Sequence, residues 1–214
     1  MARSLHSGAM ESDSLRFRDE AATQRWSACL ARALAAIALA EQTFAIHLSG
    51  HLGAGKTTLV RHLLAELGIA GPVKSPSFAL LESYNGPSFS VYHFDLYRFS
   101  SAEQWVDAGF DEIVAGAGLV LVEWPEQAAG ALPVPDLVVR LALAESGCDS
   151  VDESSGGRGD HDPSGGRGDD YLSGDGDDDL SRDAPRTVAV TALSEAGRRC
   201  LTDVARCWSR AGPG

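Results

Sequence analysis

The segment at residues 50–57 carries residue types and a spacing that suit a polyphosphate ligand. It reads Gly-His-Leu-Gly-Ala-Gly-Lys-Thr, which fits the phosphate-binding loop pattern of two glycines separated by four residues and followed by Lys and Ser or Thr. Its glycines allow backbone conformations that a Cβ would oppose, so successive N–H groups can point inward around an anion. We expect these residues to surround the phosphates: Gly53, Ala54, Gly55, Lys56, Thr57 and Thr58.

The last two residues of the motif have separate chemical roles. Lys56 is expected to reach the β- and γ-phosphate oxygens, and the Thr57 hydroxyl is expected to ligate Mg²⁺. An apolar run at 44–48 precedes the motif and a helical pattern at 58–67 follows it, which adds the unpaired N–H groups of a helix start. The ligand is then a nucleoside triphosphate with Mg²⁺. The alternative is a glycine-rich strand-to-helix turn without a ligand.

A hydrolytic site of this kind needs a second acidic residue at the end of a neighbouring strand, where it holds magnesium or its waters. Glu123 fits this position because it follows the apolar run 119–122. That run shows no alternation, which is typical of a central strand covered on both faces. The alternative is an ordinary surface carboxylate at a strand end.

The segment 91–97 alternates, and its two faces differ in character. One face is apolar, and the other carries His93, Asp95 and Tyr97. If the apolar face packs on the core, the polar face looks into the nucleotide cleft. Asp95 then positions water or magnesium or accepts a proton. An ordinary polar strand face remains the alternative interpretation.

Two serines, Ser75 and Ser77, lie in a proline-containing loop after the helix at 58–67. Loops of this kind can sense a γ-phosphate through hydroxyl and backbone contacts, so we expect a switch-like loop. The other interpretation is a simple connection between a helix and a strand.

These residues need a scaffold of alternating helices and strands. The turn Asn85-Gly86-Pro87 predicts a hairpin between two strands. Ser194 is expected to cap the last helix, and Ser100 or Ser101 is expected to cap the short helix at 101–107. We expect helices over 19–40, 58–67, 101–107 and 194–209, and strands over 44–48, 78–84, 89–97, 118–123, 137–143 and 187–193. The predicted class is α/β, a three-layer fold like that of P-loop NTPases with a mixed, mostly parallel sheet.

Charge divides the chain into two kinds of material. The net charge is −12, but residues 145–186 hold 13 acidic and 4 basic side chains, so the rest carries only −3. Low hydrophobicity and high charge predict that 145–186 is a disordered acidic insertion. Neither an extracellular Arg-Gly-Asp signal nor a calcium loop fits its context. The remaining expected parts are a flexible arm at 1–18, a domain at 19–144, its last strand and helix at 187–210, and a tail at 211–214.

Several function classes are disfavoured by composition. No basic face of a stand-alone nucleic-acid binder is evident, and the longest apolar run, 33–40, is too short to span a bilayer. The start of the chain lacks the apolar core of a signal peptide, so we expect a cytoplasmic protein. The four cysteines have no C-x-x-C spacing, which argues against zinc or redox use. Cys200 and Cys207 are expected as small apolar positions on the last helix.

Four motifs occur in register along the chain: Gly-His-Leu-Gly-Ala-Gly-Lys-Thr-Thr at 50–58, Val-Lys-Ser-Pro-Ser-Phe at 73–78, Tyr-His-Phe-Asp-Leu-Tyr-Arg at 92–98 and Leu-Val-Glu-Trp-Pro-Glu at 121–126. Together they resemble the TsaE family, also called YjeE, small bacterial ATPases of tRNA threonylcarbamoyladenosine synthesis. The resemblance covers about residues 19–144, with 187–210 as the family's last strand and helix. Ser77 departs from it, because the family often has Thr there.

The resemblance implies a Mg²⁺-dependent ATPase, weak alone, that works in a complex with TsaB and TsaD. Those partners transfer threonylcarbamoyl to adenosine 37 of tRNAs reading A-starting codons, so we expect this chain to contact tRNA only indirectly, through the complex. No association with a membrane is expected. The resemblance implies that Lys56 binds phosphate, that Thr57 and Glu123 hold magnesium, and that Asp95 is needed for hydrolysis. Thr23 and Trp124 are implied to lie near the nucleotide.

Two other function classes share the phosphate-binding loop. A small-molecule or nucleoside kinase needs an acceptor pocket and often an Arg-bearing lid. The only candidate lid here, 145–185, is acidic and would repel phosphates. A non-catalytic, nucleotide-regulated interaction module is disfavoured by the presence of both Asp95 and Glu123.

Overall fold

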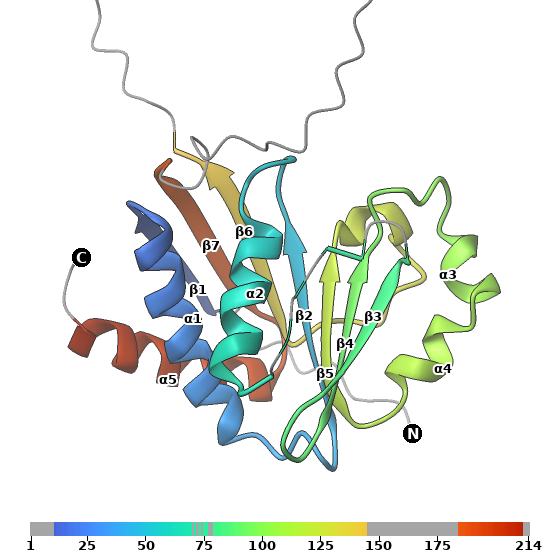
Figure 1. Cartoon of the computed structure of the whole chain (residues 1–214), viewed down its shortest axis with the longest axis horizontal. Coiled ribbons are helices and arrows are strands. Elements are labelled where there is room, and N and C mark those ends of the chain that lie inside the picture. Colours follow the sequence, from blue (N-terminus) through green and yellow to red (C-terminus); the bar gives the residue numbers. More distant parts are fainter. Residues whose placement is uncertain are drawn as a thin grey trace, which may run out of the picture.

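The computed structural model describes residues 11–69, 71, 73, 75–76, 79–144 and 184–211, and it places them around one seven-stranded sheet (Figure 1). In chain order the elements are β1 (Glu11–Phe17), α1 (Glu20–Ala35), β2 (Thr43–Ser49), α2 (Lys56–Glu66), β3 (Leu81–Asn85), β4 (Ser90–Asp95), α3 (Glu103–Asp107), α4 (Phe110–Val114), β5 (Gly118–Glu123), the 3₁₀ helix η1 (Pro125–Ala128), β6 (Leu137–Leu143), β7 (Arg186–Ala192) and α5 (Glu195–Ala211).

The sheet order is β1-β7-β6-β2-β5-β4-β3. The central strands β6, β2, β5 and β4 are parallel, while β7 and β3 run against their neighbours. This confirms the predicted mixed, mostly parallel α/β sheet. The register pairs Glu123 with both Leu48 and Asp95, so the two predicted acids meet at the edge where β2 enters the loop 50–55.

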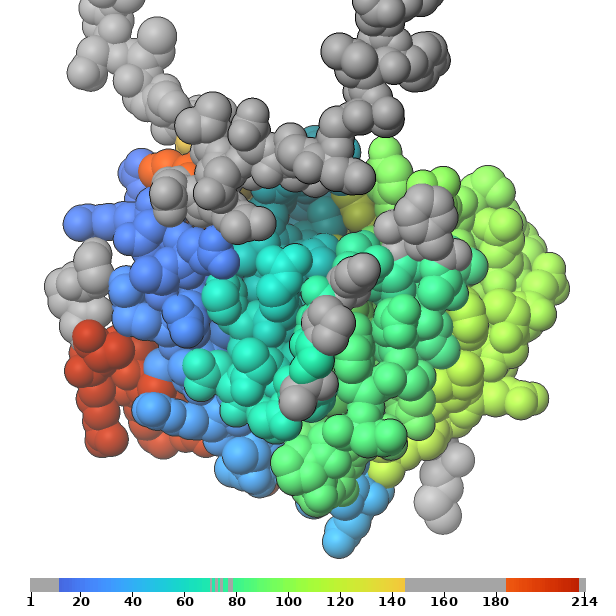
Figure 2. Space-filling view, in the orientation of Figure 1, coloured from blue at the N-terminus to red at the C-terminus, as the bar shows by residue number. Residues whose placement is uncertain are grey.

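Two apolar layers sandwich the sheet, because successive side chains of a strand point to opposite faces. Phe44, Ile46 and Leu48 of β2 face one layer, which α1, α2 and α5 cover. Ala45 faces the other layer, which includes Phe94 of β4 and is covered by α3 and α4. Every residue of β5 is buried, as its unbroken apolar run predicted. Figure 2 shows α1 and α2 side by side on the outer surface of the first layer.

The strand β1 was not expected, and the prediction of a flexible arm at 1–18 is wrong for residues 11–17. These residues pair antiparallel with β7, from Glu11 opposite Ala192 to Phe17 opposite Arg186. Phe17 is fully buried, with its ring 6.0 Å from that of Trp26 and 5.8 Å from that of Trp208. The pairing joins segments far apart in sequence, and local patterns do not register such contacts. Residues 1–10 lie outside the described residues.

The helix ends follow local hydrogen bonding. Asp19 caps α1 by accepting from the N–H of Ala22 at 2.7 Å. The Ser194 hydroxyl accepts from the N–H of Gly197 at 2.9 Å, which confirms the predicted cap of α5. The predicted serine cap of α3 is wrong: the cap position is Ala102, with no side-chain hydrogen bond. The hydroxyl of Ser100 is engaged elsewhere, donating to the Gln104 side chain at 3.4 Å.

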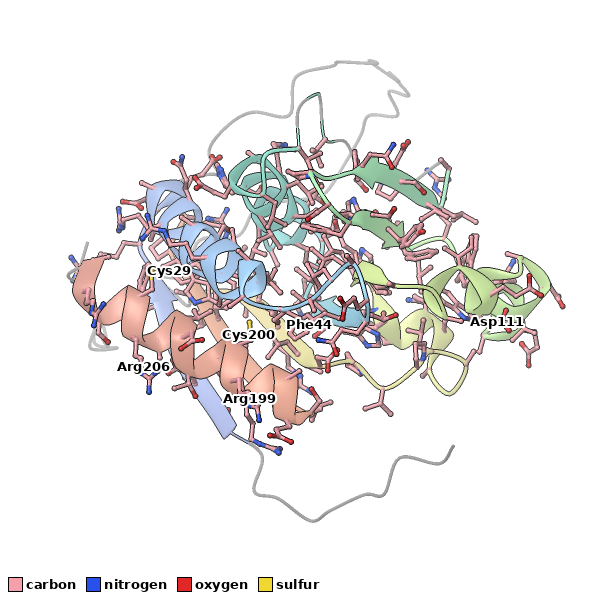
Figure 3. All side chains as sticks on the ribbon, turned by 90° about the horizontal axis from the view of Figure 1, so that it is seen from below. Cys29, Phe44, Asp111, Arg199, Cys200 and Arg206 are labelled. Carbon is pink, nitrogen blue, oxygen red and sulfur yellow. A yellow bond between two sulfur atoms is a disulfide. The ribbon has the colours of Figure 1, made fainter. Side chains whose placement is uncertain are left out.

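The cysteines differ from expectation in one respect. Cys29 of α1 and Cys207 of α5 form a disulfide, with Cα atoms 5.6 Å apart, so Cys207 is not simply an apolar helix position. Sequence spacing could not reveal this pair, because its members are 178 positions apart in the sequence. Cys200 is buried on α5, as predicted, and its thiol is free (Figure 3).

Three expectations lie outside the described residues: most of the acidic insertion, at 145–183, the position of Ser77, and the end of the tail at 212–214. The predicted bounds are wrong at two residues: Arg186, assigned to the insertion, is the first residue of β7, and Ala211, assigned to the tail, is the last residue of α5. Within the part of the chain that the structure describes, no helix combines the length and apolar character needed to cross a bilayer.

Candidate functional site

The loop between β2 and α2 is built from glycines with positive φ. The φ angles of Gly50, Gly53 and Gly55 are 145°, 76° and 97°. A Cβ on Gly50 would collide with the backbone oxygen of Leu141, and one on Gly55 would lie 2.8 Å from Nε of Arg186. The loop therefore depends on glycine for both conformation and space. Because α2 begins directly after it, the unpaired first-turn N–H groups of α2 open onto the loop.

Lys56 is the first residue of α2, and its side chain reaches back to this loop. Its ammonium donates to the backbone oxygens of Gly50 at 2.7 Å and His51 at 3.1 Å. The same nitrogen lies 3.7 Å from the centre of the Trp124 ring. Burial lowers the pKa of Lys56, an effect that the negative charges of Glu123 and two further carboxylates oppose. The Lys56 ammonium therefore lies at the loop, where phosphate oxygens could replace the carbonyl oxygens of Gly50 and His51 as its hydrogen-bond acceptors.

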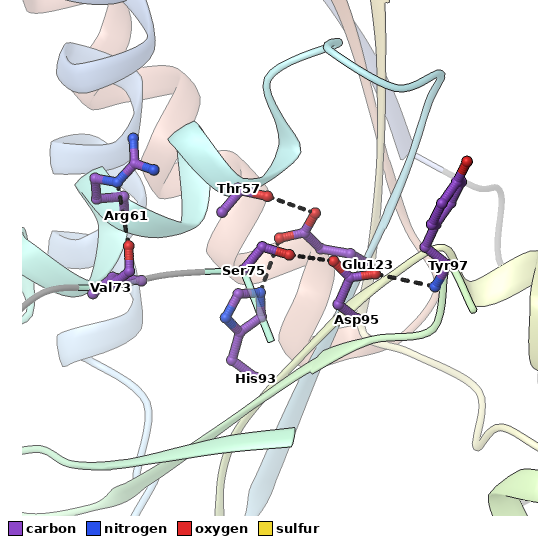
Figure 4. Close-up of polar contacts among 8 residues, drawn as sticks. All are labelled: Thr57, Arg61, Val73, Ser75, His93, Asp95, Tyr97 and Glu123. Atoms are coloured by element: carbon purple, nitrogen blue, oxygen red, sulfur yellow. Dashed lines mark hydrogen bonds and ion pairs between the residues drawn. The ribbon is translucent and has the colours of Figure 1, made fainter. Parts of the chain in front are cut away.

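Thr57, Glu123 and His93 form a chain of hydrogen bonds across three elements (Figure 4). The Thr57 hydroxyl donates to Oε2 of Glu123 at 2.9 Å, which links the start of α2 to the end of β5. Nε2 of His93 on β4 donates to the other oxygen, Oε1, also at 2.9 Å. Both Glu123 and His93 are buried. The structure therefore brings together the two residues predicted to hold magnesium and adds a third that orients the carboxylate.

Asp95 anchors two neighbouring segments. Its Oδ2 accepts from the Ser75 hydroxyl, and its Oδ1 accepts from the backbone N–H of Tyr97 at 3.0 Å. The polar face of β4 thus looks toward the phosphate-binding loop, as the alternation predicted, while Phe94 packs in the opposite core. The contact ties the loop that carries Ser75 to the acidic edge of the sheet (Figure 4).

Trp124 occupies a strained backbone position immediately after Glu123. Its φ and ψ are 59° and 49°, a left-handed conformation that is uncommon for a bulky residue. The Trp124 N–H donates to the backbone oxygen of Leu48 at 3.1 Å. Its ring lies 5.0 Å from that of Tyr97 and against the Lys56 ammonium. The strained turn therefore places an aromatic face over the Lys56 ammonium. The family resemblance implied that Trp124 lies near the nucleotide, and this stays a prediction.

The other predicted site residues have less direct support. Gly53 and Thr58 lie in the loop and in the first turn of α2, as expected. Ala54 is a buried residue of the loop itself. Thr23 is also buried, and its hydroxyl has no hydrogen-bond partner among the residues that the structure describes. Its position near a nucleotide base stays a prediction.

Two features of the site were missed by sequence reasoning. Arg186, the first residue of β7, is buried and donates through Nε to the backbone oxygen of Ala54 at 3.1 Å. It supports the loop from a strand that follows it by more than a hundred residues, and no local pattern signals this. His93 was recognised only as part of a polar face. Its HxD spacing with Asp95 was the available signal for a paired role.

Comparison with known families agrees with this geometry. The profile of the family described as "Threonylcarbamoyl adenosine biosynthesis protein TsaE" matches residues 17–150, which is more than half of the chain. The match spans β2, the phosphate-binding loop, β4 and β5, and so includes Lys56, Asp95 and Glu123.

Individual relatives carry the same name. A "tRNA threonylcarbamoyladenosine biosynthesis protein TsaE" of Haemophilus influenzae is 41% identical over 101 residues, 47% of this chain and 64% of that protein. One of Treponema pallidum is 37% identical over 125 residues, 58% of this chain and 87% of that protein. The crystal structure of Bacillus subtilis YdiB has the same fold, with a TM-score of 0.61 and 24% identity over 94% of this chain and 98% of that one. This chain therefore belongs to the TsaE family of threonylcarbamoyl adenosine biosynthesis proteins.

Proposed function

We propose that this protein binds and hydrolyses ATP as a subunit required for threonylcarbamoylation of adenosine 37 in tRNAs that read A-starting codons. It acts in the cytoplasm with homologues of TsaB and TsaD, and it meets tRNA through them. Family membership supports the pathway. The observation that carries the nucleotide chemistry is the convergence of Lys56, Thr57 and Glu123 at one edge of the sheet.

Phosphate binding follows from the loop. The glycine-rich backbone and the start of α2 supply N–H donors, and Lys56 supplies a buried positive charge. The hydrogen bonds from Lys56 to Gly50 and His51 hold the ammonium in place before a phosphate arrives. Phosphate oxygens are stronger acceptors than neutral carbonyls, so ligand binding is favoured over this closed arrangement.

The donor set fits Mg²⁺. One hydroxyl oxygen of Thr57 and one carboxylate oxygen of Glu123 lie 2.9 Å apart, and Mg²⁺ in nucleotide sites takes few protein oxygens together with phosphate and water. The buried His93 holds the carboxylate from its other oxygen. When bound, Mg²⁺ neutralises charge on the β- and γ-phosphates. Thr57 and Glu123 would supply two oxygen ligands to the ion, and His93 orients the Glu123 carboxylate.

Hydrolysis requires that the γ-phosphate be recognised, and the contacts of Asp95 support a role for it in this step. Both of its oxygens accept hydrogen bonds, one from Ser75 and one from the backbone of Tyr97. We assign Asp95 the role of holding the Ser75 segment against the phosphate end of the site, so that the loop responds when the γ-phosphate is lost. Such coupling would let hydrolysis change the surface offered to a partner.

The proposal is tested with purified protein and purified TsaB and TsaD homologues. Calorimetry with Mg·ATP is expected to show binding, and tRNA mass spectrometry is expected to show the modified adenosine only when the subunit is present. The Lys56→Ala variant should lose both, and Thr57→Ala should lose them more severely than Thr57→Ser, which keeps the hydroxyl. An Arg199→Gln variant, changed at an exposed residue of α5, is the control.

Unchanged nucleotide binding and tRNA modification in Lys56→Ala would refute the proposal. Transfer of the γ-phosphate to a metabolite instead of water would establish a kinase. Nucleotide binding without hydrolysis, even with the partners present, would establish a non-catalytic module.

A further inference from the structure

A cavity of about 530 Å³ lies between α1 and α5, on a surface that the phosphate-binding residues do not share. Both members of the disulfide are among the residues that line it, and of the two Cys207 is the more exposed. Figure 3 shows Cys29 on α1 beside α5, with Arg206 further along α5. The lining residues that matter here are Arg25, Arg32, Arg206, Arg210, Cys29 and Cys207.

The cavity is strongly positive, since four arginines face a single acidic residue in its lining, Asp203. Asp203 pairs with Arg206 at 3.2 Å, and both side chains of this pair are exposed. Within the described part of the chain, neither Arg25 nor Arg210 has a carboxylate partner. Several guanidinium groups thus remain to attract an anion from solution.

One arginine contacts the disulfide itself. Nη1 of Arg32 donates to Sγ of Cys207 at 3.8 Å. Cys207 is half-buried, whereas Cys29 is only 3% exposed, so an attacking group reaches Cys207 first. A guanidinium beside a sulfur favours the thiolate form, which is the nucleophile in thiol–disulfide exchange. The free Cys200 lacks these features: burial and the nearby charges of Asp203 and Asp136 raise its pKa to about 12.

We propose that Cys29 and Cys207 form an exchangeable redox pair and that the arginine-lined cavity binds the anionic low-molecular-weight disulfide or thiol with which they exchange. The positive lining selects a co-reactant that carries carboxylates, and the half-buried sulfur of Cys207 is the point of attack.

The exchange balances in two steps. In the reduced protein, the Cys207 thiolate attacks one sulfur of the small disulfide, which forms a mixed disulfide on Cys207 and releases one small thiolate. The Cys29 thiol then loses its proton to solvent and attacks Sγ of Cys207, which closes the protein disulfide and releases the second thiolate. Two protein thiols are oxidised and one small disulfide is reduced. Reduction runs the same steps backward.

The bond joins helices that pack on each other, and α1 also packs on α2, which carries Lys56 and Thr57. The proposed function places this protein in the cytoplasm, which is a reducing compartment, and a disulfide there is usually redox-sensing or catalytic. This choice of compartment is the one point at which the inference rests on the proposed function.

The test compares three small disulfides on the reduced, full-length protein: oxidised glutathione, which is anionic, 2-hydroxyethyl disulfide, which is neutral, and cystamine, which is cationic. Formation of the Cys29–Cys207 bond is followed by thiol alkylation and mass spectrometry. Oxidised glutathione is expected to react at least about 10-fold faster than cystamine, with an advantage that salt reduces. The Arg25→Gln/Arg32→Gln double variant should lose most of that advantage, and Arg199→Gln on α5 should keep it.

A second measurement locates the attack. In Cys29→Ser, glutathione should remain bound to Cys207 and be absent from Cys200. Equal rates for the three disulfides would overturn the anion site, and failure of the native chain to form the Cys29–Cys207 bond would overturn the redox pair. The rate comparison uses the native chain, so it holds even if the serine variant does not fold. No nucleotide or tRNA enters the assay, and its failure would leave the proposed function standing.

Discussion

The imidazole of His93 on β4 holds the carboxylate of Glu123 on β5, with Nε2 and Oε1 2.9 Å apart in a fully buried contact. The Thr57 hydroxyl binds the other carboxylate oxygen from α2. Glu123 is therefore oriented from two sides before any ligand is present. Such outer contacts fix the direction in which a carboxylate presents its free lone pairs.

Removing the imidazole should weaken the metal site more than the nucleotide site. We expect His93→Ala to raise the Mg²⁺ concentration needed for ATP turnover about 10–100-fold, because Glu123 loses one of its two orienting partners. His93→Gln, which keeps an N–H donor, should recover part of the loss. The measurement is a Mg²⁺ titration of turnover beside metal-free nucleotide binding. Tyr92→Phe, on the other face of the same strand, is the control. An unchanged Mg²⁺ requirement in His93→Ala would contradict this role.

The contact between Ser75 and Asp95 should control turnover rather than binding. We expect Asp95→Asn and Ser75→Ala to lower kcat strongly while the Kd for Mg·ATP changes little, because Lys56 and Thr57 remain in place. The double variant should be no worse than the more severe single variant, since both remove one contact. Steady-state kinetics and calorimetry measure the two quantities. Additive losses would show that the two side chains act separately.

The loop glycines should differ in their tolerance of a methyl group. In Gly53→Ala the Cβ meets open space, so only the strain of φ 76° remains, about 1 kcal/mol. In Gly50→Ala the Cβ meets the backbone oxygen of Leu141 at φ 145°, so we expect a loss of about 3 kcal/mol. Urea unfolding without nucleotide measures both free energies of unfolding. Equal losses would mean that the loop relaxes around residue 50.

Burial of His47 should make the fold sensitive to acid. Burial lowers the pKa of His47 from 6.5 to about 4, so between these values the unfolded chain binds more protons than the folded chain. Stability should therefore fall as the pH drops from 6.5 to about 4, by about 3 kcal/mol in all from this group. The measurement is urea unfolding from neutral pH down to about 4.

The comparison that isolates this effect is a pair of histidine variants. His47→Gln should flatten the pH dependence, because it removes the buried titrating group. His51→Gln, which removes an exposed imidazole, should leave the dependence as in the native chain. An identical slope in His47→Gln and the native protein would show that other groups cause the acid sensitivity.

Local pattern was enough to predict the elements around the phosphate-binding loop. The run 44–48, the glycine-rich segment after it and the apolar run ending at Glu123 correspond to β2, the loop and β5. The alternation of 91–97 also predicted that Asp95 would face the loop. These predictions succeeded because side-chain periodicity and backbone freedom are properties of neighbouring residues.

The sequence by itself determined which residues we propose to bind phosphate and metal, because their types and spacing sit within short, continuous motifs. Only the tertiary structure decided that β1 closes the sheet beside β7, that Arg186 supports the loop beneath Ala54, that His93 orients Glu123, and that Cys29 meets Cys207. Each of these is a contact between segments distant along the chain. Such contacts form through packing of the whole domain, and no local periodicity encodes them.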